Sequence, residues 1–324
     1  MTGILDQGID AIVWLQQFSP LLDVLFRCLT FLGDKEFFLI FLPLCYWSLD
    51  RRVGARLTIF FLISAYINSV AKVLCHQPRP FEYSDRVRAI VPAGGHGFPS
   101  GHTQATVLIW GYLAACFRRF WLWGLAVALM ILVPLSRLYL GVHFPTDLVG
   151  GYWLGAVMLF IAIGPALRLE ALLRQCGPGW QLAAAVLLPL GLMALFPDRT
   201  GVTAMATLTG FGVGLIAESR WVRFECDGGW QRRGLRFLLG GIVLFILWAG
   251  LGLVFASLEP KLLYRFIRHV LTGLWIAWGA PWAFVRLGLT GKRMGEGLAT
   301  GHPVDLKSGD VASGQVPYRS KSTL

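Results

Sequence analysis

Three short runs of polar residues, each beside a long apolar segment, carry the chemistry that this sequence offers. They are Lys72 with Arg79 and Pro80, Pro99-Ser100-Gly101-His102, and Ser136-Arg137 with His143 and Asp147. The first and third runs supply cations that can bind phosphate, and the second and third supply two imidazoles. Because each run lies at the edge of an apolar segment, we expect the three to meet at one surface of a membrane.

The first two runs are typical of an anion site. Lys72 ends one apolar helix, and the prolines beside Arg79 hold its backbone extended, so that its guanidinium can point back toward the lysine. Ser100 stands directly before another apolar helix, where its side chain can cap the helix and its hydroxyl can donate. The free N–H groups at that helix start, with Gly101 permitting a close approach, form an anion-binding site.

The third run pairs an imidazole with a carboxylate. Arg137 ends an apolar segment and Gly141 allows a turn after it. The i, i+4 spacing places His143 and Asp147 on one face of the first turn of the next helix. Asp147 can accept a hydrogen bond from one imidazole nitrogen of His143, which leaves the other nitrogen as a nucleophile. The remaining imidazole, that of His102, is then available as a general acid.

Each of these residues also has an ordinary structural interpretation. A histidine in a membrane helix can be a packing residue, and an arginine at a helix end, such as Arg79 or Arg137, commonly reaches to lipid headgroups. His143 with Asp147 is also half of a zinc site, for which His96 and His102 would have to supply further ligands. The coincidence of cations, an anion-binding turn and imidazoles on one side of the membrane favours a reactive site.

The composition indicates an integral membrane protein. Of the 324 residues, 56% are hydrophobic and only 15% are charged, and the mean hydropathy is +0.62. At bilayer depth the backbone has to satisfy its own hydrogen bonds, so the apolar stretches must be helices. We therefore expect an all-α fold, a polytopic transmembrane helical bundle of about nine spans. One span ends at Asp50, and the others lie near residues 55–75, 100–117, 120–140, 147–167, 180–196, 201–217, 235–258 and 264–287.

The cations are arranged as in a polytopic membrane protein. The net charge is +11, and the arginines gather on alternate connections, as Lys and Arg do in short cytoplasmic loops. The clusters include Arg51 with Arg52, Arg118 with Arg119, and Arg232 with Arg233. The three polar runs then fall on the opposite, non-cytoplasmic side. Because the cations flank apolar spans and form no basic face, we expect no nucleic-acid partner.

The three runs together resemble a known signature. Lys-x6-Arg-Pro, Pro-Ser-Gly-His and Ser-Arg-x5-His-x3-Asp are similar, in this order, to the three-part signature of the type 2 phosphatidic acid phosphatase superfamily. That superfamily includes lipid phosphate phosphatases, glucose-6-phosphatases and vanadium haloperoxidases. The resemblance covers about residues 20–170. It implies a six-helix phosphatase core, to which this chain adds extra C-terminal helices.

The resemblance also implies a role for each residue of the signature. His143 would attack phosphorus to form a phosphohistidine, Asp147 would orient it, and His102 would protonate the leaving oxygen. The phosphoryl oxygens would be held by Lys72, Arg79, Ser100, Gly101 and Arg137. Water activated by His102 would then release phosphate. Because three cations and backbone N–H groups can stabilise the transferred group, we expect neither a metal ion nor a cofactor.

Four regions are expected along the chain. They are an N-terminal amphipathic or re-entrant segment at 1–34, the membrane phosphatase core at 35–170, additional transmembrane helices at 171–287, and a polar, Gly/Ser-rich tail without a fold at 288–324.

The expected function is hydrolysis of a lipid phosphate monoester or diphosphate by a metal-independent membrane phosphatase. Its partners would be the lipid phosphate substrate and membrane lipids, and neither the particular lipid nor the oligomeric state follows from the sequence. The excess of Arg over Lys indicates a bacterial inner membrane, with the site facing the periplasm or exterior. A phosphotransferase that uses the same site, and a non-catalytic transporter or flippase of anionic lipids, are the alternatives.

Overall fold

The computed structural model describes residues 2–291, and all regular elements in this part of the chain are helices. The predicted all-α transmembrane bundle is confirmed. Of the polar tail predicted for residues 288–324, residues 292–324 lie outside the part that the structure describes.

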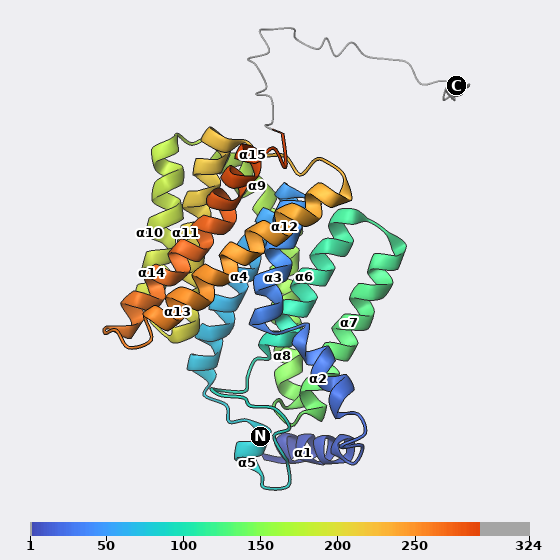
Figure 1. Ribbon diagram of the computed structural model, residues 1–324. Coiled ribbons are helices and arrows are strands. Elements are labelled where there is room, and N and C mark those ends of the chain that lie inside the picture. The colour runs from blue at the N-terminus through green and yellow to red at the C-terminus, as the bar shows by residue number, and fades with distance from the viewer. Residues whose placement is uncertain (1, 292–324) are drawn as a thin grey trace, which may run out of the picture. The chain divides into compact units, whose positions relative to one another are not determined.

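The first half of the chain forms eight α-helices and one π-helical turn (Figure 1). They are α1 (Thr2–Gln16), α2 (Asp23–Phe31), α3 (Lys35–Leu44), η1 (Cys45–Leu49), α4 (Arg51–Cys75), α5 (Pro80–Tyr83), α6 (Gly101–Phe117), α7 (Phe120–Tyr139) and α8 (Pro145–Ile163).

The second half continues the bundle. Its elements are α9 (Pro165–Gln175), α10 (Pro178–Leu195), α11 (Arg199–Ala217), η2 (Glu218–Val222), α12 (Trp230–Phe245), η3 (Ile246–Gly250), α13 (Leu251–Val254), α14 (Lys261–Leu274), η4 (Trp275–Gly279) and α15 (Ala280–Arg286).

The predicted number of about nine spans is not confirmed. Within residues 2–291, six helices are long and apolar enough to cross a membrane; they cover 51–83, 120–139, 145–163, 178–195, 199–222 and 230–254. The predicted span that ends at Asp50 is short because α3 has only 10 residues before η1. Helix α6 has 17 residues, fewer than the roughly 20 that a span needs. The segment from α14 to α15 carries Arg265 and Arg268, which lower its hydropathy.

Capping residues set the starts of the long helices. The Asp50 carboxylate accepts hydrogen bonds from the backbone N–H groups of Arg52 and Val53, both at 2.8 Å, at the start of α4. Asp198 accepts from Thr200 and Gly201 in the same way at the start of α11. These side chains satisfy the amide groups that have no acceptor within a helix.

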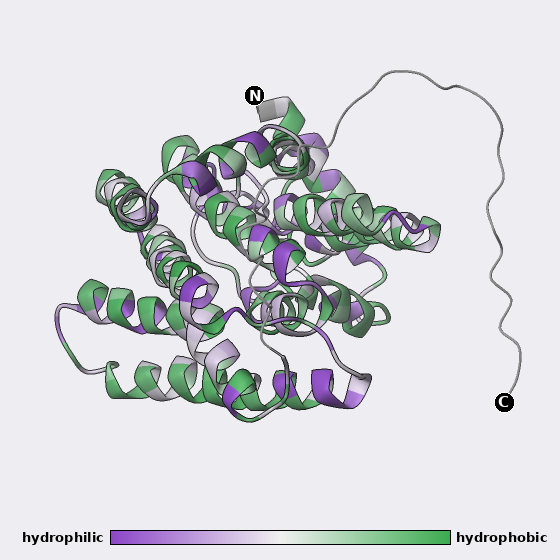
Figure 2. Ribbon diagram, turned by 90° about the horizontal axis from the view of Figure 1, so that it is seen from above, coloured by the Kyte–Doolittle hydropathy of each residue, from purple (hydrophilic) through white to green (hydrophobic). Residues whose placement is uncertain are grey.

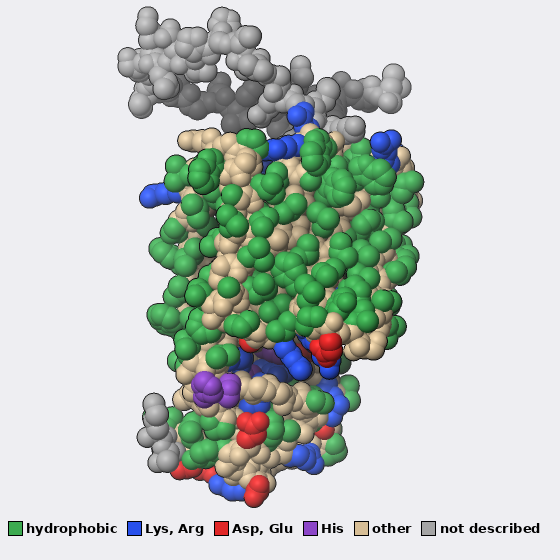
Figure 3. All heavy atoms as spheres, turned by 90° about the vertical axis from the view of Figure 1, so that its left-hand side faces the viewer, with side chains coloured by type: hydrophobic (Ala, Val, Ile, Leu, Met, Phe, Trp, Pro, Cys, Tyr) green, Lys and Arg blue, Asp and Glu red, His purple; other side chains and the backbone are tan. Residues whose placement is uncertain are grey.

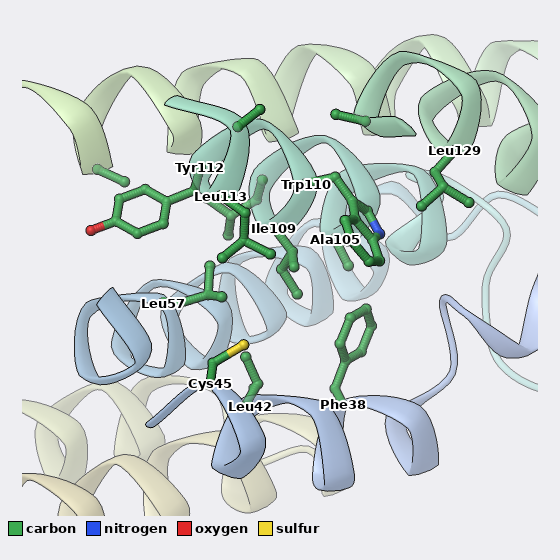
Figure 4. Packing of buried hydrophobic residues seen from close by; sticks show 14 of the residues in the cluster. Phe38, Leu42, Cys45, Leu57, Ala105, Ile109, Trp110, Tyr112, Leu113 and Leu129 are labelled. Atoms are coloured by element: carbon green, nitrogen blue, oxygen red, sulfur yellow. The ribbon is translucent and has the colours of Figure 1, made fainter. Parts of the chain in front are cut away.

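Helix α6 is the central helix of the first half. Every residue from Thr103 to Ala114 is buried. Its apolar side chains pack against α3, α4 and α7, and Figure 4 shows Phe38, Leu57 and Leu129 from these helices around it. Burial on all sides fixes the position of its N-terminus, where His102 lies.

The outer surface of the bundle is apolar, as a lipid-facing surface requires. Large side chains such as Leu187 on α10 and Ile242 on α12 are 66% and 59% exposed. Figure 2 shows apolar residues over most of the helices, and Figure 3 shows a broad apolar surface with charged side chains at its two edges. Together with the six apolar helices, this surface identifies an integral membrane protein.

The two ends of the bundle differ in character. The turn with Arg118 and Arg119 and the start of α12 lie at one end, at the top of Figure 1. Helices α1 and α5 lie at the other end. There, Ile9 and Ile12 of α1 pack against Val87 and Phe144, so that the N-terminal helix covers the connections next to the polar runs.

Helix α11 packs closely against α14 at a glycine. A Cβ atom at Gly210 would overlap with the backbone carbonyl of Val270. We expect Gly210→Leu to force the two helices apart and lower the free energy of unfolding by about 1–3 kcal/mol. Thermal unfolding in detergent measures this loss. The matched control is Gly124→Leu on α7, where an added Cβ meets nothing within 4 Å; equal melting temperatures for the two variants would contradict the packing described.

Candidate active site

Lys72 lies in the last turn of α4, and its ammonium group points at the loop before α6. Its Nζ donates hydrogen bonds to the backbone carbonyls of His96, at 2.8 Å, and Gly97, at 2.9 Å. An ammonium group has three N–H donors. One donor of Lys72 is therefore left for an incoming anion.

Arg79 connects two separate loops. It is buried, and its Nε and Nη2 donate to the carbonyls of Gly95 and Gly94, both at 2.8 Å. Its Nη1 donates to the carbonyl of Val142 at 2.7 Å, directly before His143 in the chain. Three of the five guanidinium N–H donors are thus used, and two remain.

Ser100 is the N-cap of α6, as predicted. Its fully buried hydroxyl oxygen accepts hydrogen bonds from the backbone N–H of Thr103, at 3.4 Å, and from the Thr103 hydroxyl, at 3.0 Å. At the next position, a Cβ atom on Gly101 would lie 3.1 Å from Oδ1 of Asn68. The absence of a side chain at Gly101 lets the N–H groups of this helix start lie against α4.

His143 and Asp147 form a buried pair at the start of α8. Nδ1 of His143 lies 3.0 Å from Oδ2 of Asp147, and both side chains are almost fully buried. The same carboxylate accepts from the Phe144 backbone N–H at 2.9 Å and from the Gln77 side chain at 2.7 Å. With Nδ1–H donating to Asp147, the lone pair of His143 is on Nε2. The connection before this pair turns at Gly141, whose φ of +73° favours glycine.

The second and third polar runs are in direct contact. The backbone N–H of Ser100 donates to the carbonyl of Asp147 at 2.9 Å. Glycines allow this approach, because a Cβ on Gly151 would lie 2.6 Å from the carbonyl oxygen of Ser100. A Cβ on Gly97 would likewise lie 3.0 Å from Oδ2 of Asp147. A side chain at Gly151 would separate the start of α6 from α8, and one at Gly97 would push the loop before α6 away from Asp147.

His102 is held by a carboxylate from the N-terminal part of the chain. Its Nε2 lies 2.9 Å from Oδ1 of Asp34, in the connection between α2 and α3. Burial raises the pKa of Asp34, but the hydrogen bond and charge of His102, with the charge of Arg137, outweigh burial, so the pKa lies below its ordinary value. Asp34 is therefore an ionised acceptor at neutral pH.

Arg137 completes the group of cations from the last turn of α7. Its side chain is 6% exposed, and its Nη1 donates to the hydroxyl of Thr30 on α2. Within residues 2–291 its buried Nε has no hydrogen-bond partner. A buried guanidinium N–H without an acceptor is unfavourable unless an anion supplies one.

Three of the predicted cations lie close enough to His143 to change its pKa. Burial lowers the pKa of His143 well below 6.5, and the positive charges of Arg137, Lys72 and Arg79 lower it further. The imidazole is therefore neutral at pH 7, with the lone pair on Nε2 available to react. The same three cations that keep the imidazole neutral attract an oxyanion to its edge.

These contacts bring together all eight predicted site residues at one end of the bundle. Figure 3 shows this end hollowed between the apolar surface and the segment below it, with Lys and Arg side chains in the hollow. The arrangement offers a neutral imidazole with one unprotonated nitrogen, a second imidazole and unused cationic N–H donors. Within residues 2–291 there is no group of three or more His, Cys, Asp or Glu residues with the geometry of a metal site.

Sequence reasoning missed three residues that hold this site. Asp34 positions His102, Gln77 donates to Asp147, and Thr30 accepts from Arg137. Asp34 is the N-cap of α3 but makes no capping hydrogen bond, because its carboxylate is used on His102. In the sequence, an aspartate before a helix that binds a site residue looks the same as an aspartate that only caps the helix. Gln77 lies two residues before Arg79, and this closeness to a predicted site residue was the one sign in the sequence that Gln77 could belong to the site.

Comparison with known proteins matches two family profiles. The profile described as the PAP2 superfamily matches residues 54–165, which contain all three polar runs. The profile described as the PAP2 superfamily phosphatase transmembrane extension matches residues 202–293.

Individual relatives share the first of these regions. The chain is 34% identical to sphingosine-1-phosphate phosphatase 2 of Mus musculus over 142 residues, 42% of this chain and 40% of that protein. It is 30% identical to undecaprenyl-diphosphatase of Sulfolobus acidocaldarius over 131 residues, 38% of this chain and 63% of that protein. It is also 30% identical to YbjG of Escherichia coli over 141 residues, 40% of this chain and 70% of that protein. The chain thus spans less than two thirds of the first two relatives.

The lowered pKa of His143 has a spectroscopic consequence. An ordinary histidine with a pKa of 6.5 is half protonated at pH 6.5, whereas we expect His143 to be neutral there, with its proton on Nδ1. Nitrogen NMR of protein labelled at histidine, with His143→Gln to assign the signal, measures the protonation state and tautomer. An imidazolium signal from His143 at pH 7, or a neutral form protonated on Nε2, would contradict the arrangement.

Proposed function

This chain belongs to the PAP2 superfamily, that of the type 2 phosphatidic acid phosphatases, and from that premise we propose that it removes phosphate from a membrane lipid through a phosphohistidine at His143. The observation that carries the proposal is the contact set of Asp147. Its carboxylate accepts from His143, Phe144 and Gln77, which holds one imidazole nitrogen as a donor and leaves the other unprotonated. Three cations act on that imidazole.

In the first step, Nε2 of His143 attacks phosphorus. The new N–P bond forms as the bond from phosphorus to the lipid oxygen breaks, and the electron pair of that bond leaves with the oxygen. His102 supplies the proton that this oxygen needs from Nδ1 of its imidazolium form, while its Nε2–H stays bonded to Asp34. Asp147 stabilises the positive charge that develops on His143.

In the second step, water attacks the phosphohistidine. His102, now without its proton, takes one from the water as the O–P bond forms and the N–P bond breaks. Inorganic phosphate leaves, and both imidazoles return to their starting protonation states. Asp34 keeps the ring of His102 in one orientation for both steps, because its carboxylate accepts from Nε2.

The cations and helix start act on the phosphoryl oxygens. Lys72 has one unused N–H donor and Arg79 has two, and the buried Nε of Arg137 has no partner among the described residues. The N–H groups at the start of α6, near Ser100 and Gly101, lie on the same side. Donors fixed in advance stabilise the charge of a transferred phosphoryl group without reorganising.

A lipid is the substrate class that the position of the site supports. The site lies where apolar helices end, so a phosphate at headgroup depth reaches it while its chains stay among lipids. The named relatives that act on sphingosine-1-phosphate and on undecaprenyl diphosphate support a monoester or diphosphate on a long chain. Because the arginine-bearing turns lie at the opposite end, we propose that the site faces away from the cytoplasm.

Phosphate release from defined lipids tests the proposal. We expect purified protein in detergent to release inorganic phosphate from a long-chain lipid phosphate or diphosphate with EDTA present, because its charge stabilisation comes from Lys72, Arg79 and Arg137. His143→Ala should abolish release, and a quench with denaturant should trap labelled phosphate on the wild type alone. The control is His76→Asn, at an exposed residue whose left-handed backbone suits asparagine. Full dependence on added Mg²⁺, or a near-normal rate for His143→Ala, would refute the mechanism.

Asp34 is a positioning residue, and its effect should depend on the leaving group. Asp34→Asn should lower kcat/KM for an alkyl phosphate by about 10- to 100-fold, because a poor leaving group needs the proton of His102 in the first step. For p-nitrophenyl phosphate, whose leaving group needs no proton, kcat/KM, which reports only this first step, should change little. Asp34→Glu should restore part of the loss. Equal losses on both substrates would mean that Asp34 only supports the fold.

A further inference from the structure

A partly open cavity with both polar and apolar walls lies between helices of the bundle, apart from the residues of the candidate active site. Its volume is about 590 Å³, and it is bounded by α3, α4, α11 and α14. None of Lys72, Arg79, Arg137 or His143 lines it. The helices α11 and α14 belong to the region matched by the transmembrane extension profile, so this cavity forms only where that extension meets the rest of the bundle.

One wall of the cavity is polar and cationic. On α14, Arg265, Arg268, His269 and Thr272 follow the spacing i, i+3, i+4, i+7, which places them on one helix face, and all four line the cavity. From α11, a threonine face that includes Thr203 also lines it. The polar faces of two helices within an apolar bundle are thus turned toward the same partly open cavity.

The opposite wall is mostly apolar. Phe38 and Leu42 of α3 and Phe61 and Leu62 of α4 form its apolar part, and Lys35 and Glu36 at the exposed start of α3 also line the cavity. An occupant of this cavity therefore meets cations on one side and hydrocarbon on the other. That pattern matches an amphiphile and does not match a free ion, which needs polar groups on every side.

The two arginines Arg265 and Arg268 have no counter-charge among the residues that the structure describes. Within residues 2–291 neither guanidinium forms an ion pair, and the Nε atoms of both are buried without a hydrogen-bond partner. Arg268 lies over the ring of Trp248, 5.0 Å from its centroid, and the charge of Arg265 repels it. The acid among the lining residues, Glu36, has a half-exposed side chain that lies 3.6 Å from Lys35.

An anion would relieve this imbalance. Two like charges that lie close together among apolar helices are costly unless a group of opposite charge accepts their hydrogen bonds. A phosphate group has enough oxygens to accept from both guanidinium groups at once. Basic pockets between membrane helices bind anionic lipid headgroups for this reason.

We propose that this cavity is a binding site for an anionic phospholipid. Its phosphodiester group accepts hydrogen bonds from Arg265 and Arg268, and an acyl chain lies along Phe38, Leu42 and Phe61. The site does not depend on the proposed phosphatase function, because a phosphodiester lipid is held there without reaction. The lipid would fill the space between the extension and α3 and α4, and so join the two parts of the bundle.

Native mass spectrometry of the detergent-purified protein tests the proposal. We expect His143→Ala, which excludes turnover, to bind one phosphatidylglycerol in preference to phosphatidylcholine. Adding Arg265→Gln and Arg268→Gln should weaken phosphatidylglycerol binding by about tenfold or more. The matched control is Arg119→Gln with Arg232→Gln, two exposed arginines outside the cavity, which removes the same charge and should not change binding. Equal affinities for the two double variants would overturn the proposal.

Three further measurements test whether the cavity itself holds the lipid. Ala65→Trp fills the cavity from α4 without changing charge and should also prevent lipid binding; unchanged binding would refute the site even if the arginine variants misfold. Inorganic phosphate at equal concentration should not displace the lipid, and displacement would indicate a site for a free anion. Release of p-nitrophenol from p-nitrophenyl phosphate by the arginine double variant, with His143 intact, should match wild type; a loss would assign the arginines to the phosphatase site.

Discussion

The hydrogen bonds of Asp147 join the segments on which the site depends. Its carboxylate accepts from His143 and from Gln77, which follows α4, and its backbone carbonyl accepts from the N–H of Ser100 at the start of α6. Three parts of the chain, far apart in sequence, therefore meet at one buried residue. A buried carboxylate is tolerated only when its oxygens are bonded, so the loss of any partner would disturb the other two segments as well.

The fold was largely predictable, because the bilayer restricts apolar segments to helices. The number of spans was harder to predict, and two helices show why. Helix α6 is short but buried along its length, so the protein around it replaces the lipid that a longer span would need. Helix α14 carries Arg265 and Arg268, which face a cavity and not the lipid. Hydropathy averages a helix over its faces and cannot distinguish these cases from polar surface helices.

The site was predictable where its residues fall in runs with fixed spacing. The i, i+4 pair of His143 and Asp147 is local, and its hydrogen bond follows from helix geometry. The contact between Asp34 and His102 joins residues 68 positions apart and depends on how α3 packs beside α6. No local pattern contains that information, because an aspartate before a helix is common whatever its side chain touches. The residues that position the site are therefore harder to predict than those expected to react.

The hydrogen bonds of Lys72 and Arg79 bear on which residues are retained when a related chain loses its activity. Both cations hold the carbonyls of the loop at Gly94–Gly97, so they keep their place in the structure whether or not phosphate ever arrives. A descendant that had lost its chemistry would still be selected to retain them for folding. The presence of the lysine and arginine motif is thus a weak indication that a given homologue is an active enzyme. The presence of His102, which binds no loop carbonyls, is a better indication.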